Sequence, residues 1–265
     1  MNRIEEKMQE LQAEGKKAFI TYMTAGLPDL DTTAKILKAE EAAGLDVCEV
    51  GIPFSDPIAD GPVIQDASYR AILNGTNLTQ ILEMMEKLRA EGMKMPIVFM
   101  MYYNTVFSMG LENFVKACAK AGVDGLIIPD LPKEEQQPLQ SVLDEEEGAP
   151  ILIQLVSPIS ADRVPYLLEG ARGFVYCVSS MGVTGKNVNF GKQIHDYLSS
   201  VKAVSKIPVM MGFGIKTAED VLPLKDALDG AIVGSHFIRL MDENNFAPEV
   251  AGEYVKTFKE KLNND

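Results

Sequence analysis

Short apolar runs alternate with longer amphipathic stretches along this 265-residue chain, and that alternation constrains its fold more than any other feature. Each run is apolar at nearly every position, as expected of parallel strands that are covered on both faces. The sequence therefore predicts strands separated by helices and packed as a parallel sheet. Eight runs meet this description: residues 18–23, 47–52, 97–102, 125–128, 151–156, 174–178, 209–212 and 231–234.

The stretches between these runs carry apolar residues at three- and four-residue spacing, which is typical of helices with one buried face. Ile81, Met84, Met85 and Leu88 are an example. The same spacing predicts helices at residues 31–43, 63–73, 78–90, 111–121, 133–147, 160–169, 189–204 and 217–228. One further helix is predicted at each end of the chain, over residues 1–14 and 248–262.

Three of the predicted helix-to-strand joints resemble one another. Ala43-Gly44-Leu45-Asp46 recurs as Ala121-Gly122-Val123-Asp124, and Leu228-Asp229-Gly230-Ala231 is a looser version. In each joint the glycine is placed to end the preceding helix in a left-handed conformation. The recurrence indicates a repeated strand–helix architecture.

The order of these elements favours one closed barrel. No linker rich in Pro, Gly and Ser divides the chain, so we expect a single domain over residues 1–265. Eight strand–helix units in one domain predict an α/β fold of the (β/α)8 TIM-barrel type, with the extra N-terminal helix closing its bottom. The alternative is an open doubly wound sheet, which usually has a glycine-rich turn after its first strand; residues 24–29 lack that turn.

Composition narrows the class of partner and the compartment. The formal charge of −13 argues against nucleic acid or an anionic membrane as the main partner. Cys48, Cys118 and Cys177 lie in apolar surroundings without metal-binding spacing, as buried thiols do in a reducing compartment. No apolar run approaches the length of a membrane span, and the charged N-terminus does not read as a signal peptide. We therefore expect a cytoplasmic protein.

Residue 49 carries the strongest sign of chemistry. Glu49 lies inside an apolar run, where an ionised carboxylate is costly. Strand alternation places it on the same face as Val47 and Gly51, which we expect to point into the barrel. Apolar surroundings raise the pKa of a carboxyl, so Glu49 is a candidate general acid and base. The structural alternative is an ion pair with a basic residue inside the barrel.

The loop after this run carries two more carboxylates, Asp56 and Asp60, and is stiffened by Pro53, Pro57 and Pro62. It follows the carboxyl end of a strand, where barrel enzymes hold their active groups. Either aspartate could instead cap a helix or form a turn. Position alone does not rank Asp60 above Asp56.

Glycine-bearing segments follow the last three predicted strands, at residues 182–185, 211–215 and 233–236. Glycine lets backbone N–H groups approach an anion, and barrels often bind phosphate after their last two strands. The alternative is that these glycines form ordinary tight turns. The polar loop over residues 179–189 is a candidate lid over a bound substrate, and the alternative is a disordered surface loop. The two histidines, His195 and His236, lie in no motif, so no metal site is expected.

These motifs make the chain similar to the α subunits of tryptophan synthase over essentially its whole length. The stretch Glu-Val-Gly-Ile-Pro-Phe-Ser-Asp-Pro-Ile-Ala-Asp-Gly-Pro at residues 49–62 is the most specific of them. The others are weaker alone but fall in the correct order: Met101-Tyr102-Tyr103-Asn104, Gly122-Val-Asp-Gly, Gly182-Val-Thr-Gly185, Gly212-Phe-Gly214 and Gly234-Ser235.

The resemblance implies a lyase that cleaves indole-3-glycerol phosphate to indole and glyceraldehyde 3-phosphate by a retro-aldol reaction. By residue-to-residue match, it implies that Glu49 is the catalytic acid and base and that Asp60 holds the indole N–H. The matching substrate-binding positions are Tyr22, Met100, Tyr176, Thr184, Gly185, Phe213, Gly214, Ile232, Gly234 and Ser235.

The resemblance also implies a partner. The α subunit is expected to pair with a β subunit in an α2β2 complex, and pyridoxal phosphate is expected only in that β subunit, so no cofactor is expected in this chain. Two other functions stay open from the residues themselves. One is a differently acting phosphate-binding barrel such as a sugar-phosphate isomerase; the other is a non-catalytic barrel that regulates a partner.

Overall fold

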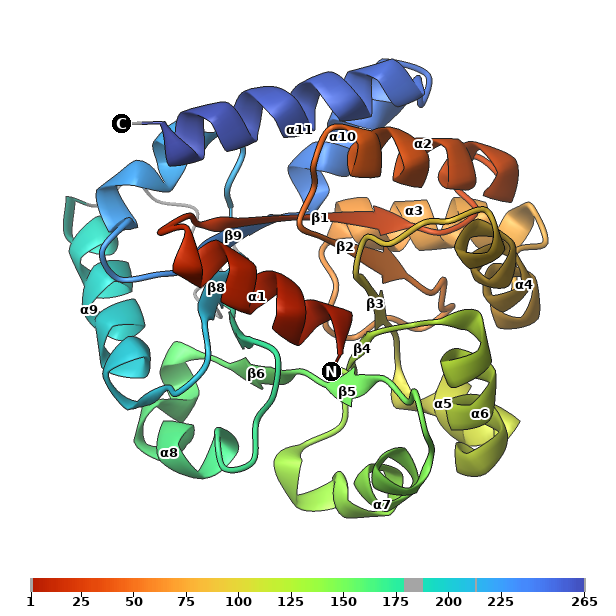
Figure 1. Ribbon diagram of the computed structural model, residues 1–265, viewed down its shortest axis with the longest axis horizontal. Helices are drawn as coiled ribbons and strands as arrows, with labels where there is room; N and C mark the ends of the chain where they lie inside the picture. Colours follow the sequence, from red (N-terminus) through yellow and green to blue (C-terminus); the bar gives the residue numbers. More distant parts are fainter. Residues whose placement is uncertain (1, 179–187, 213, 265) are drawn as a thin grey trace.

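The computed structural model describes residues 2–178, 188–212 and 214–264 (Figure 1). Over those residues, nine parallel strands form one sheet in the order β5-β4-β3-β2-β1-β9-β8-β7-β6. The two edge strands, β5 (Ile151–Leu152) and β6 (Gln154–Val156), are halves of a single run. Because β5 pairs with one neighbour and β6 with another, the sheet closes on itself as a barrel. The predicted (β/α)8 fold is confirmed, and the open sheet is wrong.

The elements follow the predicted alternation closely. The remaining strands are β1 (Ala18–Thr24), β2 (Val47–Gly51), β3 (Ile97–Met100), β4 (Gly125–Ile127), β7 (Val175–Cys177), β8 (Val209–Met211) and β9 (Gly230–Val233). The α-helices in the described part are α1 (Arg3–Ala13), α2 (Leu30–Ala42), α3 (Pro62–Leu73), α4 (Leu78–Ala90), α5 (Tyr103–Met109), α6 (Leu111–Ala121), α7 (Gln137–Glu145), α8 (Val164–Leu167), α9 (Val188–Val204), α10 (Ser235–Glu243) and α11 (Pro248–Asn263).

Two separate apolar clusters fill the molecule. The larger one lies between the strands and the surrounding helices and includes Cys48 and Val50. The smaller one fills the barrel interior and includes Val47, Ile20 and Ile232. Strand alternation thus sends neighbouring residues of β2 to opposite sides, as the sequence predicts.

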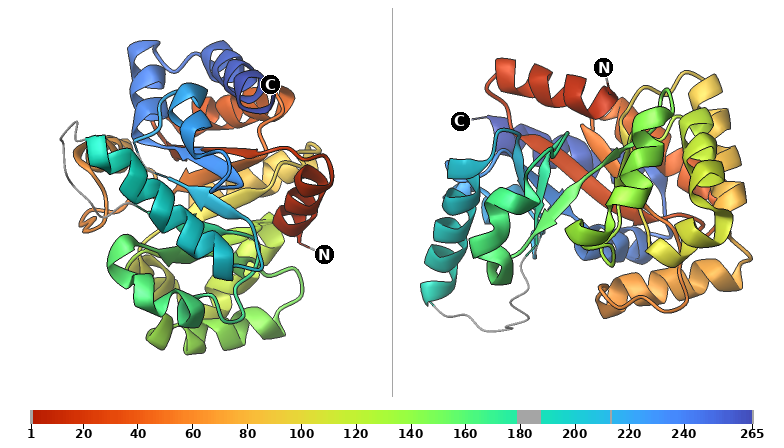
Figure 2. Two further views of the ribbon diagram at one scale, coloured as in Figure 1. Left: turned by 90° about the vertical axis from the view of Figure 1, so that its left-hand side faces the viewer. Right: turned by 90° about the horizontal axis from the view of Figure 1, so that it is seen from below.

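Helix α1 lies across one end of the barrel (Figures 1 and 2). Its buried residues Ile4, Met8 and Leu11 join the interior cluster, so this helix closes the bottom. The Asn2 side chain caps the helix and donates a hydrogen bond to the carbonyl of Asp124 at 2.8 Å. The predicted N-terminal closing helix is confirmed.

One predicted helix is replaced by shorter turns. Residues 217–228 form two 3₁₀ turns, η3 (Ala218–Asp220) and η4 (Leu222–Leu224), in place of an α-helix. Pro223 lies in the middle of this stretch and has no N–H to donate, which interrupts an α-helix. Prolines also shorten the two helices predicted after the fourth and fifth strands. The first becomes η1 (Lys133–Glu135) and α7, and the second becomes η2 (Pro158–Arg163) and α8.

The glycines of the helix-to-strand joints have two different roles. Gly44 and Gly122 have φ angles of 85° and 67°, the left-handed conformation predicted for them. The same expectation is wrong for Gly230, which lies in β9 without a positive φ. A Cβ there would lie 2.4 Å from Sδ of Met210 and 2.6 Å from the carbonyl oxygen of Ala18. Gly230 therefore allows close strand packing.

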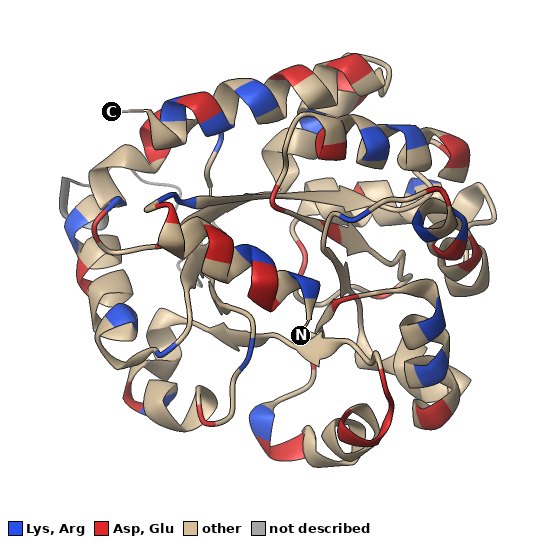
Figure 3. Ribbon diagram, viewed as in Figure 1, with Lys and Arg blue, Asp and Glu red and all other residues tan. Residues whose placement is uncertain are grey.

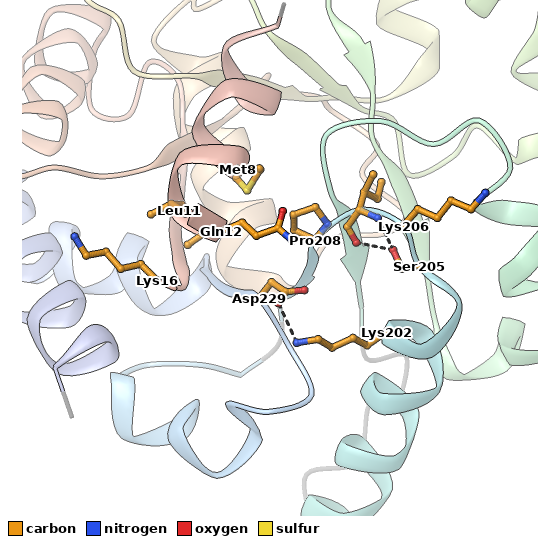
Figure 4. Close-up of a pocket in the computed structure, with 11 residues that line it drawn as sticks. Met8, Leu11, Gln12, Lys16, Lys202, Ser205, Lys206, Pro208 and Asp229 are labelled. Carbon is orange, nitrogen blue, oxygen red and sulfur yellow. Dashed lines mark hydrogen bonds and ion pairs between the residues drawn. The ribbon is translucent and has the colours of Figure 1, made fainter. Parts of the chain in front are cut away.

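Charged side chains lie mainly on the helices and loops, while the strands are almost free of them (Figure 3). At the bottom of the barrel, a hollow of about 240 Å³ separates α1 from the segment between α9 and β8 (Figure 4). Lys202 points toward Asp229 there, at 2.9 Å. In the described ranges, no helix is long and apolar enough to cross a membrane.

Candidate functional site

A cavity of about 450 Å³ opens at the carboxyl ends of the strands, opposite α1. Its walls come from residues that follow or end β2, β3, β7, β8 and β9, the end at which barrel enzymes hold their sites. The described wall residues include Asp60, Met100, Tyr176, Gly214, Ile232, Gly234 and Ser235, all of them predicted site residues. Ala59, Gly61, Ile64, Val178, Gly212, Ile215, Lys216, His236 and Arg239 complete the wall.

Glu49 lies in the barrel interior, on the face of β2 that also carries Val47. Its side chain is fully buried, and neither carboxyl oxygen has a hydrogen-bond partner among the described residues. Burial raises the pKa of Glu49 to about 8. At neutral pH this carboxyl is therefore mainly protonated, and no ion pair holds it in place. The structural alternative, an ion pair with a basic residue, is not present among the described residues.

Two tyrosines lie beside Glu49. Tyr22 pairs in register with Glu49 across β1 and β2. Burial, followed by the charges of Glu49 and of Asp60, raises the pKa of Tyr176, a residue that also lines the cavity. Both hydroxyls lie over glycines: a Cβ on Gly51 would lie 2.0 Å from Oη of Tyr22, and one on Gly212 would lie 2.4 Å from Oη of Tyr176. These two glycines make room for the rings.

Asp60 is held by an aromatic residue of a neighbouring strand end. Tyr102 donates its hydroxyl to Oδ2 of Asp60 at 3.0 Å and accepts the N–H of Ala59 at 2.9 Å. The Tyr102 ring stacks on Phe54 with centroids 5.1 Å apart, which fixes the other end of the loop. Burial raises the pKa of Asp60, and the hydrogen bond from Tyr102 opposes that rise. Asp56, by contrast, accepts a hydrogen bond from the neighbouring Ser55 on the surface.

The other end of the cavity suits an anion. Gly234 and Ser235 lie at the start of α10, where no side chain caps the first amide groups. Lys216 and Arg239 add two cationic side chains to the wall. Burial, together with the positive charges of Lys216 and Arg239, lowers the pKa of His236. The N-terminus of α10 and these two cationic side chains therefore make this end of the cavity electrostatically positive.

Three predicted site residues, Thr184, Gly185 and Phe213, lie outside the described residues, as does most of the loop predicted to cover the substrate. Of the others, Glu49 is buried inside the barrel, and strand alternation places Tyr22 on the same face of β1 as the interior residue Ile20. Neither residue is part of the cavity wall. Met100 and Ile232 supply an apolar wall near the tyrosines. The site thus contains the buried, protonated carboxyl of Glu49, the carboxyl of Asp60 on the cavity wall, an apolar wall and an anion-binding end.

Comparison with known proteins places this arrangement in a family. A family model described as tryptophan synthase alpha chain matches residues 8–265. The tryptophan synthase alpha chain of Lachnospira eligens is 65% identical over 263 residues, covering 99% of this chain and 100% of the relative. The one from Alkaliphilus metalliredigens is 46% identical over 262 residues, covering 99% and 97%. The chain belongs to the tryptophan synthase alpha chain family.

Solved structures agree with this membership. Tryptophan synthase subunit alpha from Legionella pneumophila has a TM-score of 0.89 at 32% identity, covering 99% of this chain and 98% of that one. Mycobacterium tuberculosis tryptophan synthase has a TM-score of 0.87 at 31% identity, covering 100% and 99%. The chain is therefore a lyase, with the α reaction of tryptophan biosynthesis as its activity. The family's α chain carries no cofactor, pyridoxal phosphate belongs to the β subunit, and a β subunit is its general partner.

Sequence reasoning missed several residues of the cavity. Lys216 and Arg239 line its anion end, beside His236 of the predicted segment 233–236, and Tyr102 orients Asp60. The signal for Tyr102 was its place in the motif Met101-Tyr102-Tyr103-Asn104. The two cationic residues had no such signal. Lys216 lies on the exposed segment after β8 and Arg239 on the exposed face of α10, and only the folded barrel brings both to the cavity.

Proposed function

We propose that Glu49 is the acid and base that cleaves indole-3-glycerol phosphate to indole and glyceraldehyde 3-phosphate. The observation that carries this proposal is a fully buried carboxyl with no hydrogen-bond partner, beside a ligand-sized cavity that has an anion-binding end. Such a carboxyl can release a proton and take one back in the same turnover. Burial raises the pKa of Glu49 to about 8, which suits both steps near neutral pH.

The steps balance with these residues alone. Protonated Glu49 gives its proton to C3 of the indole ring, which makes the ring a cationic leaving group. Asp60, ionised and oriented by Tyr102, hydrogen-bonds the ring N–H and stabilises its positive charge. The Glu49 carboxylate then takes the proton of the glycerol hydroxyl next to the breaking bond. The C–C bond electrons return to the ring, so indole and an aldehyde leave and Glu49 is again protonated.

Binding of the substrate follows the shape of the cavity. The phosphate would bind the first amides of α10 and the glycines Gly214 and Gly234, next to Lys216 and Arg239. The indole ring would pack between Met100, Ile232 and Tyr176 of the cavity wall, with Tyr22 as a deeper contact beside Glu49. Thr184, Gly185, Phe213 and Ser235 complete the proposed contacts from the matched motifs. Phosphate binding far from the reacting carbon orients the bond that breaks.

We extend the proposal to assembly, domain structure and compartment. The chain acts as one domain over residues 1–265, in the cytoplasm, and associates with a β subunit as an α2β2 complex. The exposed side chains of Ile58 and Phe107, 82% and 69% accessible, lie on segments near the cavity mouth and are candidates for that contact.

The experiment is turnover of indole-3-glycerol phosphate by the purified chain, with and without a β subunit. The chain contains no tryptophan, so released indole is detected by fluorescence against a tyrosine background. We expect Glu49→Gln to lower kcat by about 10²-fold or more, the contribution typical of general acid–base catalysis. Binding of glycerol 3-phosphate, measured by calorimetry, should stay unchanged. Turnover by Glu49→Gln near the wild-type rate contradicts the assignment.

A further inference from the structure

Two helices that start at the cavity are joined by an ion pair well behind it. Helix α3 begins at Pro62, two residues after Asp60, and α10 begins at Ser235 at the anion end. Arg70 of α3 and Asp242 of α10 form two hydrogen bonds, from Nη1 to Oδ2 at 3.1 Å and from Nη2 to Oδ1 at 2.9 Å. At a rise of about 1.5 Å per residue, the pair lies roughly 12 Å along α3 and roughly 10 Å along α10 from the start of each helix. Neither side chain lines the cavity.

Beyond Val63 and Ile64 of its first turn, which are partly buried against the outer apolar cluster, helix α3 places no large side chain fully in the core. Its fully buried side chains are small: Ala67, Ser68 and Ala71. Its large apolar residues Tyr69 and Leu73 are 62% and 66% exposed. Small side chains allow close approach but bury little apolar area, so burial holds this helix only weakly.

Helix α10 is anchored far more firmly. It buries Phe237, Ile238 and Met241 in the outer apolar cluster. The chain after it turns through Asn245 and Phe246, which have φ angles of 51° and 55°, a left-handed conformation that Asn adopts more readily than other residues but that is rare for Phe. This turn buries the Phe246 ring, and the guanidinium of Arg70 lies 5.9 Å from its centroid. Arg70 therefore contacts two groups of a rigid neighbour.

We propose that the Arg70–Asp242 ion pair is a positioning pair that fixes the helix carrying Asp60 relative to the helix at the anion end of the cavity. The two ends of one substrate must be held at a set separation, and the first turns of α3 and α10 both line the cavity. A planar guanidinium that binds a carboxylate at two points fixes direction as well as distance. The inference rests on the proposed function for the identity of the substrate.

The test compares Arg70→Ala with a matched control at the other end of the barrel. Arg172 and Glu5 also form a two-point pair, with hydrogen bonds of 2.9 and 2.8 Å, between the α8–β7 connection and α1. We expect Arg70→Ala to lower kcat for indole-3-glycerol phosphate about 10-fold, because a displaced Asp60 no longer meets the ring. The affinity for glycerol 3-phosphate should stay within twofold, because α10 is anchored independently. Arg172→Ala should leave kcat within twofold.

The charge-swapped protein Arg70→Asp with Asp242→Arg separates positioning from a general loss of stability. We expect it to recover most of the lost kcat, whereas Arg70→Lys, which cannot bind at two points, should recover less. Equal kcat in Arg70→Ala and the wild type overturns the inference. A parallel loss of glycerol 3-phosphate affinity also overturns it, since that result indicates damage to both walls.

Hydrogen exchange gives a readout that does not depend on turnover. In Arg70→Ala, the amides of α3 should exchange about 10-fold faster, while those of α10 and of the remote α6 stay unchanged. Unchanged exchange in α3 overturns the inference. A wild-type protein that releases no indole contradicts the proposed function, and the exchange data then still decide whether the ion pair fixes α3.

Discussion

Two buried carboxyls of this barrel differ in what surrounds them. Glu40 of α2 accepts hydrogen bonds from Oγ1 of Thr21 at 2.6 Å and from Sγ of Cys48 at 3.5 Å. Glu49 has no such partner. Burial raises the pKa of both, to about 7 for Glu40 and about 8 for Glu49. Hydrogen bonds that favour the charged form account for the lower value of Glu40.

The raised pKa of Glu49 predicts how stability depends on pH. Its folded pKa of about 8 exceeds the unfolded value of 4.5, so its contribution is fully present below pH 4.5 and is lost as the pH rises to 8. In this window the loss is about 1.4 kcal/mol per pH unit. Glu49→Gln removes this pH-dependent loss. In urea unfolding, the free energy of unfolding of the variant should therefore rise relative to that of the wild type from pH 5 to pH 8. For Glu40→Gln the gain should level off sooner, near pH 7. A difference independent of pH contradicts the assigned protonation.

The same pKa predicts that kcat/KM decreases at alkaline pH. The proposed reaction starts from protonated Glu49, so kcat/KM should fall tenfold per pH unit above about 8. The measurement is kcat/KM for indole-3-glycerol phosphate between pH 6 and pH 10. As a control, Tyr69→Phe removes an exposed phenol and should leave this decrease in place. A constant rate up to pH 10 would rule out Glu49 as the initial acid.

Single residues were predictable from the sequence only where their type conflicted with their surroundings. Glu49 stood out because a charge in an apolar run is costly. Asp60 and Asp56 could not be ranked by position, and the resemblance alone selected Asp60. The fold gives the physical reason: Asp60 lines the cavity and binds Tyr102, whereas Asp56 binds its exposed neighbour. Arg239 could not be predicted as a cavity residue, because its position at the cavity depends on how α10 packs.

At the scale of elements, periodicity located nearly every strand and most helices. Its failure at residues 217–228 has a local cause, since apolar spacing there suits a helix but Pro223 removes a needed donor. Helix α5 escaped notice because it is short and buries only Val106. The predicted run 151–156 is split into β5, which pairs with β4, and β6, which pairs with β7. The apolar pattern within one run does not specify its pairing partners.

The close contact between β7 and the residue after β8 yields a prediction for the site. A Cβ on Gly212 would lie 2.4 Å from Oη of Tyr176, so the Tyr176 ring must shift to make room for it. We expect Gly212→Ala to lower kcat/KM by about 10²-fold, the effect of a displacement near 1 Å at a reacting centre. Gly191→Ala is the control, since its Cβ meets nothing within 4 Å. Full activity in Gly212→Ala would show that the position of Tyr176 is not critical.

At the scale of the whole molecule, the proposed catalytic site and the helix that completes the interior core lie at opposite ends of the barrel. The cavity lies at one end, while α1 closes the other and completes the interior cluster. Both ends share one sheet, so no part of the described barrel has a core of its own. This continuity supports the proposal of one domain, and we predict that α1 unfolds together with the rest of the barrel.

Ile4 tests that view, because it belongs to the closing helix and is fully buried. Its side chain occupies space left by two glycines: a Cβ on Gly125 or Gly173 would lie 2.8 or 3.3 Å from it. Ile4→Ala should lower the free energy of unfolding by about 2–5 kcal/mol, since the neighbouring glycines have no side chains that could fill the space left by the deleted atoms. Leu73→Ala, at a residue 66% exposed, should cost under about 0.5 kcal/mol.

The measurement is urea unfolding of both variants, followed by circular dichroism and by tyrosine fluorescence. The two signals should coincide in one transition, and kcat at 25 °C should stay near wild type because the closing helix lies opposite the cavity. Separate transitions would mean that the closing helix and the rest of the barrel unfold independently. A loss below about 1 kcal/mol in Ile4→Ala would mean that α1 covers the barrel without completing its core.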